Sequence, residues 1–573
     1  MKNSSEKNLE KTEIYQVSSI SNDDALVYAA YGKAGGNLDE LALADSKKAA
    51  HLLEEARANL ELAEEGGYTP ELRRNFSLLS LLGVGFGLTN SWYGISASLV
   101  AGINSGGPML IIYGIIILAS IGMCVAVSLG EMASAMPNSG GQYYWTQKLA
   151  PKKYAAVSSY LCGSLAWAGA VFTSAAVTVT IGSSVVGMYM ISHPEKEVQK
   201  WQVFLVYEVA NLMLVIFNVY EGPLPHISKA SLYITLSSFC IITIVVLSMS
   251  GGEFSSPKFV FTEFTNGTGW SSSAIAFFVG LINPNWSFSC LDAATHIAEE
   301  SSRPRTDVPK AIIGTVIIGF ITSFSYSIAM FFCIKDLDAI NNSNTGVPIM
   351  DIYYQATNSK AAAIGLQFLI LFTAFACNIN CQTWQARLAW SFSRDNGLPG
   401  SKIWAKVNQK TGSVVNSHLM SCGWNAVIGF IYLGSTTAFN SILTCCVLFL
   451  SISYSIPTFF LIFKRNQIKP GPFWLSRFNI GLCCNIIVVC WSVFTFIFYN
   501  FPPVMPVTLG NMNYSCVVFG IYFLYCFIDW QLRAKHCFIT AEEREARKDE
   551  LTRQLSQQVS KIEVVVSNIE KTV

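Results

Sequence analysis

The sequence has few charged residues for its length. Of its 573 residues, only 13% are Asp, Glu, Lys or Arg, whereas a soluble globular protein has roughly 25%. The net charge is +1, so the composition does not indicate a basic surface for nucleic acid. The chain also lacks a Walker loop, a G-x-S-x-G elbow and an H-E-x-x-H motif. These absences argue against the enzyme classes that such motifs mark.

A cleavable signal peptide and metal-type cysteine spacing are also missing. The first residues, MKNSSEKNLEKTE, are polar and no apolar segment follows them, so we expect membrane insertion to begin at an internal span. The 16 cysteines lie mostly within apolar stretches, as Cys377 and Cys381 do, and they show no zinc-type spacing. We interpret them as small apolar residues. The sequence therefore predicts neither a metal site nor a cofactor.

Long apolar segments are abundant. Hydrophobic residues make up 51% of the chain, and stretches of about 20 residues are long enough to cross the ~30 Å hydrocarbon core of a bilayer. We predict an all-α integral membrane protein with twelve transmembrane helices. The predicted spans are 78–101, 108–132, 156–190, 202–220, 227–249, 272–296, 310–334, 361–388, 415–433, 438–463, 474–499 and 512–534.

Charged segments flank this apolar region on both sides. We expect residues 1–75 to form an N-terminal tail and residues 535–573 a C-terminal tail. The transporter-like region between them, 76–534, would comprise core helices over 78–463 and peripheral helices over 474–534.

The distribution of basic residues predicts that both tails are cytosolic. An even number of spans places both termini on one side of the membrane. With the termini in the cytosol, the inner loops carry 16 Lys and Arg residues and the outer loops carry five, as the positive-inside rule requires. N-glycosylation sequons also fall in predicted outer loops, at Asn266, Asn341 and Asn513.

Two of the predicted spans are interrupted by helix-breaking and polar residues. The first contains GVGFGLTNSWYG (83–94) and the sixth contains INPNWSFSCLD (282–292). A helix in lipid must satisfy its own backbone groups, so such breaks indicate a cavity or a protein contact. Because the two spans are five apart, they predict inverted repeats of spans 1–5 and 6–10 around a midplane substrate site. The alternative is that the glycines only permit close helix packing.

Three ordered motifs resemble those of the amino acid/polyamine/organocation permeases. EMASAMPNSGGQYYW (131–145) resembles that family's signature after span 2, DAATHIAEE (292–300) its span 6–7 signature, and RDNGLP (394–399) the signature after span 8. Within the family the chain most resembles the fungal choline permeases, whose sister branch is the GABA permeases. The resemblance to the choline permeases lies in the stretches SLLGVGFGLTNSWYGIS, FVGLINPNWSFSCLDAATH, CQTWQARLAWSFSRDNGLP, and FPPVMPVT with NMNY. The resemblance implies a LeuT-like 5+5 inverted-repeat core, alternating access and a plasma-membrane location.

A choline site needs different chemistry from an amino acid site. A quaternary ammonium has no N–H to donate, so aromatic faces and shape must hold it, whereas an amino acid carboxylate needs N–H groups at a helix break. Aromatic and polar residues flank both predicted breaks, and Trp286 resembles the family position that covers the substrate. For most of these aromatic residues, ordinary helix packing is the alternative. The predicted substrate-binding residues are Asn90, Ser91, Trp92, Tyr93, Trp167, Trp286, Phe288, Ser289, Asp292 and Tyr454.

Carboxylates within or at the ends of spans are functional candidates, because an ionisable group is costly there. Glu131 closes the second span and is expected to have a structural or gating role, whereas Glu208 is expected to be structural. Asp292 follows the sixth-span break and resembles the position of a proton-sensitive acid in relatives. We therefore predict that Asp292 compensates the substrate charge or couples transport to protons. His296, one turn later, is expected to be structural.

These observations favour import of choline, or of a related small organic cation such as ethanolamine, by a non-enzymatic permease. The driving force would be the membrane potential, proton symport or both. The expected partners are the organic cation, the lipid bilayer and, as a candidate coupling ion, the proton. Two alternatives remain open: a GABA or amino acid permease on the same fold, and a transporter-like nutrient sensor.

Overall fold

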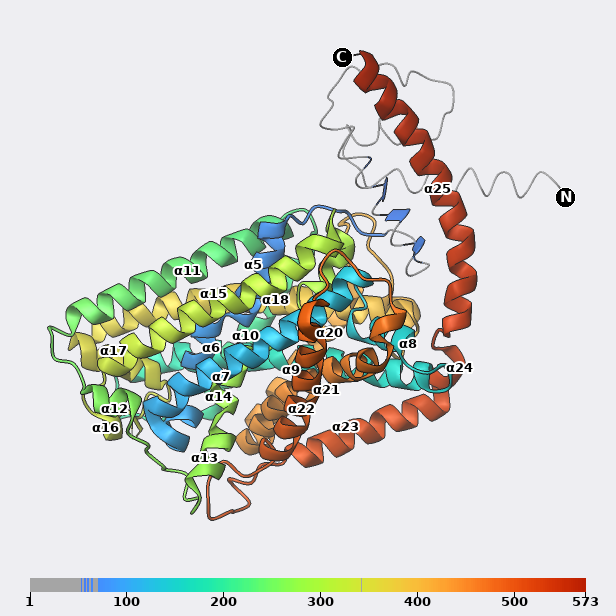
Figure 1. Ribbon diagram of the computed structural model, residues 1–573. Coiled ribbons are helices and arrows are strands. Elements are labelled where there is room, and N and C mark those ends of the chain that lie inside the picture. Colours follow the sequence, from blue (N-terminus) through green and yellow to red (C-terminus); the bar gives the residue numbers. More distant parts are fainter. Residues whose placement is uncertain are drawn as a thin grey trace.

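The computed structural model describes residues 53, 56–57, 59–60, 63–64, 68, 71–341 and 343–572. Most of the predicted N-terminal tail therefore lies outside the described residues. Long helices run side by side through the body of the molecule, and the C-terminal helix α25 (Ala541–Thr572) projects away from one end (Figure 1). In the described part of the chain, the β-structure is one isolated parallel bridge between Phe76 and Ser301.

The helices of the body have the following bounds. They are α5 (Leu78–Thr89), α6 (Ser91–Ala97), α7 (Leu99–Ala135), α8 (Gln142–Leu149), α9 (Lys152–Met190), α10 (Lys200–Val215), η2 (Ile216–Asn218), α11 (Leu224–Met249), α12 (Pro257–Phe261), α13 (Ser273–Gly280), α14 (Ile282–Trp286), η3 (Thr295–Glu300), α15 (Pro304–Phe332), α16 (Leu337–Asn341), α17 (Pro348–Thr357), α18 (Lys360–Arg394), α19 (Ser401–Trp404), α20 (Val415–Gly434), α21 (Thr436–Lys464), η4 (Arg465–Gln467), η5 (Arg477–Asn479), α22 (Ile480–Phe498), α23 (Ser515–Asp529), η6 (Trp530–Ala534) and α24 (Lys535–Cys537).

Nine helices of the described ranges are long and apolar enough to cross a membrane. They begin at Leu99, Lys152, Lys200, Leu224, Pro304, Lys360, Thr436, Ile480 and Ser515. The predicted all-α membrane class is thereby confirmed. Of the three other predicted spans, the first and sixth are divided into short helices, and the ninth is the 20-residue helix α20. Serine N-caps start several helices, as Ser359 does for α18 by accepting a hydrogen bond from the Ala362 amide at 3.3 Å.

The predicted interruption of the first span lies at Asn90. This residue separates α5 from α6 with φ 37° and ψ 65°, a left-handed conformation that asparagine tolerates. A second discontinuity follows within α7, where Gly106 and Gly107 leave helical geometry just before Pro108. The segment 99–105, assigned from sequence partly to the first span, is therefore a short helix joined to the second span. Gly83 packs so closely on the Ser228 carbonyl of α11 that no Cβ would fit without a shift, so the close-packing role of these glycines is real as well.

The interruption of the sixth span lies later than the Asn-Pro-Asn triplet suggests. Pro284 sits in the first turn of α14, where its missing N–H is not needed. The helix ends at Trp286, and the chain continues through turns to η3, with Cys290 in the left-handed region at φ 63°. The chain therefore unwinds at Cys290, within the stretch 282–292 that the sequence predicts to be interrupted.

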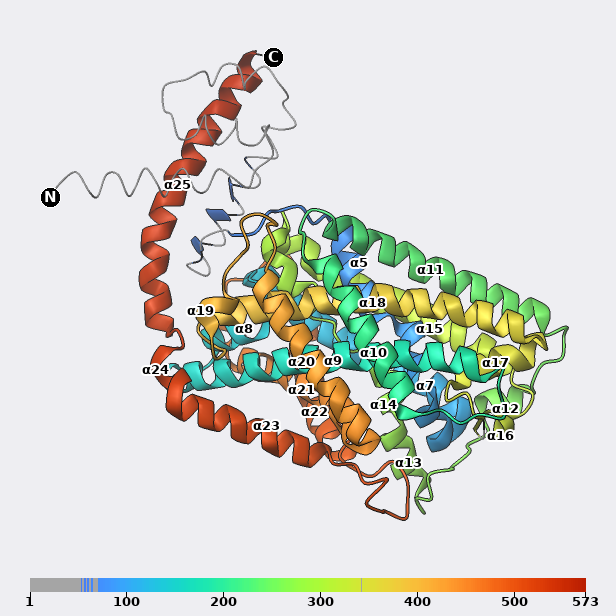
Figure 2. The same ribbon diagram turned by 180° about the vertical axis from the view of Figure 1, so that it is seen from behind.

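Long helices pack against the helices that flank the two breaks: α5 lies beside α11 (Figure 2) and also packs against α15, and α14 packs against α7. The helix α15 packs against α5, α6 and α7, and α18 and α21 pack against α9. The helix α22 packs against α21 and α7, and α23 against α21, at the outside of the body. The core of the bundle thus surrounds the two breaks.

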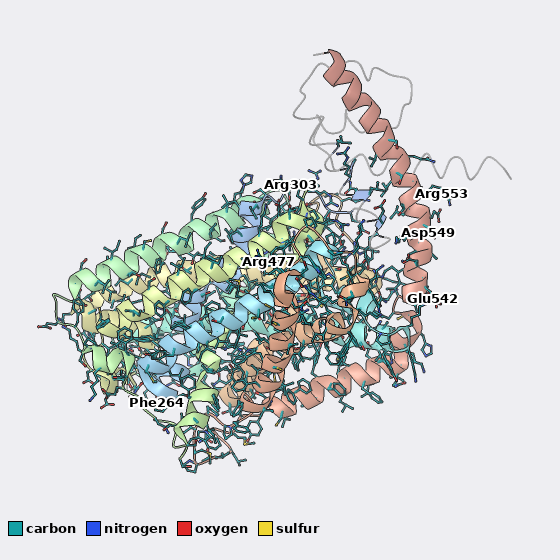
Figure 3. All side chains as sticks on the ribbon, viewed as in Figure 1. Phe264, Arg303, Arg477, Glu542, Asp549 and Arg553 are labelled. Carbon is teal, nitrogen blue, oxygen red and sulfur yellow. The ribbon has the colours of Figure 1, made fainter. Side chains whose placement is uncertain are left out.

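The loops divide between two ends of the bundle. Arg303, from a predicted inner loop, lies on the side toward α25, whereas Phe264, from a predicted outer loop, lies at the far end (Figure 3). At that far end the loop around Asn266 contacts the loop that leads to Asn513, because the Met505 amide donates to the Thr268 carbonyl at 2.6 Å. Glycosylation of Asn266, Asn341 and Asn513 stays a prediction.

Candidate functional site: a cavity between two broken helices

The two helix breaks contact each other directly. Thr89, the last residue of α5, donates from its hydroxyl to the Ser289 carbonyl at 3.1 Å. On the other side of the first break, a Cβ placed on Gly94 would lie 3.0 Å from the Ser287 hydroxyl. The unwound part of the sixth span is therefore held against both halves of the first span.

A cavity of about 120 Å³ lies beside these breaks. Two aromatic side chains line it, Tyr93 from α6 and the half-buried Trp286 from α14. Hydroxyl-bearing residues line it as well, namely Thr89, Ser98, Thr173 and Thr180. None of its lining residues, all of which the structure describes, carries a formal charge.

The ring of Tyr93 is fixed by its own hydroxyl. That hydroxyl hydrogen-bonds Thr180 of α9, which also lines the cavity. The ring of Trp286 packs against the hydrophobic core at the end of α14, directly before the unwound segment. The cavity therefore presents two aromatic surfaces, one from each broken span.

A second, smaller cavity of about 30 Å³ lies on another side of the sixth-span break. The predicted site residues Phe288, Ser289 and Tyr454 line it, together with Asn285 and Trp491. This volume has room for about two water molecules. Five of the ten predicted substrate-binding residues thus line one or the other of the two cavities.

Asp292 lines neither of these two cavities. Its carboxylate is buried and accepts hydrogen bonds from the Tyr454 hydroxyl at 2.6 Å and from the Gln142 amide at 2.6 Å. The His296 Nε2 atom lies 3.0 Å from the same Oδ2 that Gln142 contacts. Asp292 therefore joins the unwound segment to α8 and α21, while its neighbour Cys290 lines the larger cavity.

Other predicted site residues face neighbouring helices. Thr235 of α11 donates to Asn90 Oδ1 at 2.8 Å and accepts from the Trp92 indole at 3.1 Å. The Ser91 hydroxyl lies where a Cβ on Gly319 of α15 would collide with it. Trp167 donates from its indole to the Ser421 hydroxyl at 3.2 Å, between α9 and α20. The structure therefore places these four residues in helix packing and not at a cavity lining.

Glu131 is bound at the end of α7. Its carboxylate accepts from both terminal nitrogens of Arg465, at 2.5 and 2.6 Å, and from the Leu475 amide at 2.7 Å. The carboxylate is fully buried and the guanidinium nearly so. This bidentate pair ties the second span to the segment that connects α21 and α22, which fits the predicted structural or gating role.

Further buried ion pairs close the same end of the bundle. Glu299 of η3 pairs with Arg394 at 2.7 Å, and Glu300 pairs with Arg387 at 2.9 Å. Arg387 is fully buried within α18, near the end of the span predicted over 361–388. The sequence signal for these pairs was the acidic doublet at 299–300, which lies seven residues after Asp292 in the signature motif.

Residues of both tails form hydrogen bonds and an ion pair at this end of the bundle. Arg544 of α25 pairs with Asp395 at 2.8 Å, and the Tyr68 hydroxyl donates to the same carboxylate at 2.6 Å. Arg544 also donates to the Gln147 side chain of α8 at 2.9 Å. The described tail residues therefore dock on the body, which the sequence did not predict.

Comparisons with known proteins agree with this architecture. A family model described as amino acid permease matches residues 76–522. A choline transporter of Saccharomyces cerevisiae is 55% identical over 479 residues, which cover 84% of this chain and 85% of that protein. A 7-keto 8-aminopelargonic acid transporter of the same organism is 37% identical over 509 residues, which cover 78% and 90%.

A solved structure shares the fold. The crystal structure of MhsT in complex with L-phenylalanine matches with a TM-score of 0.50 at 15% sequence identity. The match covers 74% of this chain and 97% of that one. At this identity the likeness concerns the fold alone.

Proposed function

This chain belongs to the amino acid permease family and is a membrane transporter, and we propose that it imports choline across the plasma membrane. In this proposal Tyr93 and Trp286 hold the quaternary ammonium against their ring faces. The threonine and serine hydroxyls of the larger cavity form hydrogen bonds with the choline hydroxyl. Related cations such as ethanolamine would compete for the same site.

The observation that carries this proposal is the uncharged aromatic lining of the larger cavity. Tyr93 and Trp286 contribute rings, and the remaining lining residues are apolar or carry hydroxyls and thiols. A carboxylate would need a cation or several donors, and no lining side chain is charged, so an amino acid fits this lining less well. A quaternary ammonium needs neither, because an aromatic face attracts it by about 0.5–2 kcal/mol.

The pattern of relatives supports the same substrate. The protein with 55% identity over most of both chains is named a choline transporter, whereas the one named for 7-keto 8-aminopelargonic acid has 37% identity. Because of this second relative, an amino acid substrate is the main alternative to choline. The two substrates differ in net charge and in hydrogen-bonding groups, so a competition assay distinguishes them.

We propose that transport occurs by alternating access in a domain of twelve spans with a 5+5 inverted-repeat core and both termini in the cytosol. The breaks at Asn90 and Cys290 support this arrangement, because they lie in predicted spans five apart and contact each other. The buried ion pairs at the α8 end would then form the closed inner gate. Residues 1–75 and 535–573 would be the cytosolic tails.

The membrane potential favours uptake of a cation. A monovalent cation that moves inward gains ~2.3 kcal/mol per 100 mV of inside-negative potential. This corresponds to roughly a 50-fold concentration ratio per 100 mV. Proton symport would add to this ratio.

Uptake of radiolabelled choline in cells that lack their own choline carrier tests the proposal. Surface expression is measured in parallel, and unlabelled ethanolamine, GABA and arginine serve as competitors. We expect saturable choline uptake that ethanolamine reduces and GABA leaves unchanged. GABA transport without choline transport by protein at the surface would move the assignment to an amino acid permease.

A further inference from the structure

Four lysines lie where the beginning of α9 meets the end of α21. Lys152 and Lys153 are the first two residues of α9, and both are exposed. Lys464 is the last residue of α21, and its Nζ atom donates to the carbonyl oxygen of Ala150 at 3.4 Å. Lys469 follows in the next segment and is exposed. Two basic segments that are far apart in the sequence therefore meet at one surface.

The segments that form this surface contain no acidic residues. No Asp or Glu occurs between residues 132 and 194 or between residues 396 and 528. Glu545 of α25, which approaches the neighbouring helix α8, pairs with Lys148 and Lys548. Among the residues that the structure describes, no carboxylate forms an ion pair with any of the four lysines. The surface therefore keeps a net positive charge.

Exposed aromatic rings flank the lysines. Tyr154 is 52% exposed and directly follows Lys153, whose ammonium lies 5.3 Å from the centre of the tyrosine ring. Phe463 is 70% exposed and directly precedes Lys464. Aromatic residues next to lysines at the ends of spans are typical of the boundary between the headgroups and the hydrocarbon of a bilayer. The two rings therefore indicate that the lysines lie at the level of the lipid headgroups.

We propose that this surface binds an anionic phospholipid of the cytosolic leaflet, with the lipid phosphate against the lysines and the acyl chains against Tyr154 and Phe463. The inference rests on the proposed cytosolic termini, which place this end of the bundle at the inner leaflet, and it does not depend on choline as the substrate. Each lysine near an anionic membrane surface strengthens binding by about fivefold. A soluble anion would contact the lysines alone and leave both rings in water.

The bound lipid would hold the segment that carries Arg465. Lys464 directly precedes Arg465, and Lys469 lies beyond it, after η4. Arg465 forms the buried ion pair with Glu131 at the end of α7. Contacts from one lipid to both lysines would fix η4 from its two ends, and so would stabilise the Glu131–Arg465 pair. Lipid binding should therefore raise the thermal unfolding temperature.

The test uses the purified full-length protein in detergent and phosphatidylserine that carries a fluorophore on one acyl chain. Fluorescence anisotropy gives the half-saturating lipid concentration, and phosphatidylcholine with the same fluorophore is the uncharged comparison. We expect saturable binding of phosphatidylserine at lower concentrations than phosphatidylcholine, and an unfolding temperature that rises with phosphatidylserine. Equal half-saturating concentrations of the two lipids would overturn the proposal.

Two double variants remove the charge from either side of the surface. Lys152→Gln with Lys153→Gln changes the start of α9, and it should raise the half-saturating phosphatidylserine concentration about thirtyfold. Lys464→Gln with Lys469→Gln changes the other segment and should have a similar effect. Because the two variants alter different segments, one that fails to fold leaves the other to decide. Wild-type affinity in both folded variants would overturn the assignment.

The matched control is Lys402→Gln with Lys406→Gln, which removes two exposed lysines from another predicted inner loop. It should leave the half-saturating phosphatidylserine concentration unchanged. An equal rise in this control would mean that the lipid responds only to the total charge of this side of the protein, and would overturn a defined site.

Glycerophosphoserine, the soluble headgroup, distinguishes a lipid site from a site for free phosphate compounds. At a concentration equal to that of the labelled lipid, it should leave the lipid bound. Displacement would assign the surface to soluble phosphates and overturn the lipid assignment. Lipid binding is measured without transport, so failure of the choline proposal and failure of this inference are separate results.

Discussion

Tyr93 and Trp286 line the same cavity from two different broken helices. Each side chain lies next to a break in its own span, Tyr93 three residues after Asn90 and Trp286 four residues before Cys290. A movement of either break relative to the other would therefore change the distance between the two rings. In the proposed transport cycle, this relationship would connect substrate binding to the helix movements of alternating access.

Removal of the Trp286 ring should weaken choline binding. Trp286→Leu loses a cation–π contact of about 1–2 kcal/mol, so the half-saturating choline concentration for counterflow should rise roughly tenfold. Trp286→Phe keeps a ring and should lose less. Trp201→Leu, at an exposed tryptophan of α10, is the control that should leave the concentration dependence unchanged. An unaltered half-saturation in Trp286→Leu would remove this residue from the site.

Loss of one partner of the Glu131–Arg465 pair should destabilise the protein strongly. Glu131→Gln leaves the nearly buried Arg465 guanidinium without its counterion, which costs about 3–5 kcal/mol for a buried pair. The thermal unfolding temperature of the purified protein in detergent measures the effect. The exposed pair of Lys335 and Glu253, at 2.8 Å, is the comparison. Lys335→Met should cost less than about 1 kcal/mol, and equal losses from both variants would contradict this account.

Glu221 should make stability depend on pH. It lies in the loop before α11, and burial, aided by repulsion from Glu300 and opposed by Arg387, raises its pKa to about 8 from an ordinary value of 4.5. The folded protein therefore holds a proton there that the unfolded chain releases, so stability should fall as pH rises from about 4.5 to about 8.

Glu221→Gln mimics the protonated side chain and should remove this slope. The stability of the variant relative to the wild type should then increase by up to about 4 kcal/mol between pH 5 and pH 8.5. Melting temperatures over that range measure it, with Glu542→Gln at an exposed acid of α25 as the control. A pH slope that persists in Glu221→Gln would assign it to another group.

Arg544 should hold the C-terminal helix to the body. Arg544→Gln breaks the buried pair with Asp395 and the contact with Gln147, so limited proteolysis within 541–572 should become at least about tenfold faster. Arg553→Gln, at an exposed arginine of the same helix (Figure 3), should leave the cleavage rate unchanged. Equal cleavage rates for wild type and Arg544→Gln would show that this pair does not anchor the helix.

The sequence located the two breaks because polar residues and glycines stand out in apolar spans. Within the stretch 282–292, Pro284 does not mark the unwinding, since it is accommodated in the first turn of α14. The sequence could not predict which way Asn90 and Trp92 face, because the direction of their side chains depends on α6 starting directly after the left-handed Asn90. Both residues turn to Thr235 of α11, away from the cavity.

The buried ion pairs of the proposed inner gate were harder to predict for a different reason. Its ion pairs join residues that are far apart in the chain, such as Glu131 with Arg465 and Asp395 with Arg544. No local periodicity or spacing relates such partners, and tertiary contacts alone decide them. The carboxylate of Asp292 illustrates the same limit, since the sequence predicts a functional role for it but does not predict its contacts with Gln142 and His296.

Choline counterflow in proteoliposomes tests the central claim most directly. Vesicles that contain the purified protein and unlabelled choline are diluted into labelled choline, and entry of label is followed over time. The account predicts transient accumulation of label in choline-loaded vesicles and none in GABA-loaded vesicles. Accumulation in GABA-loaded vesicles alone would contradict it, and would identify the larger cavity as an amino acid site.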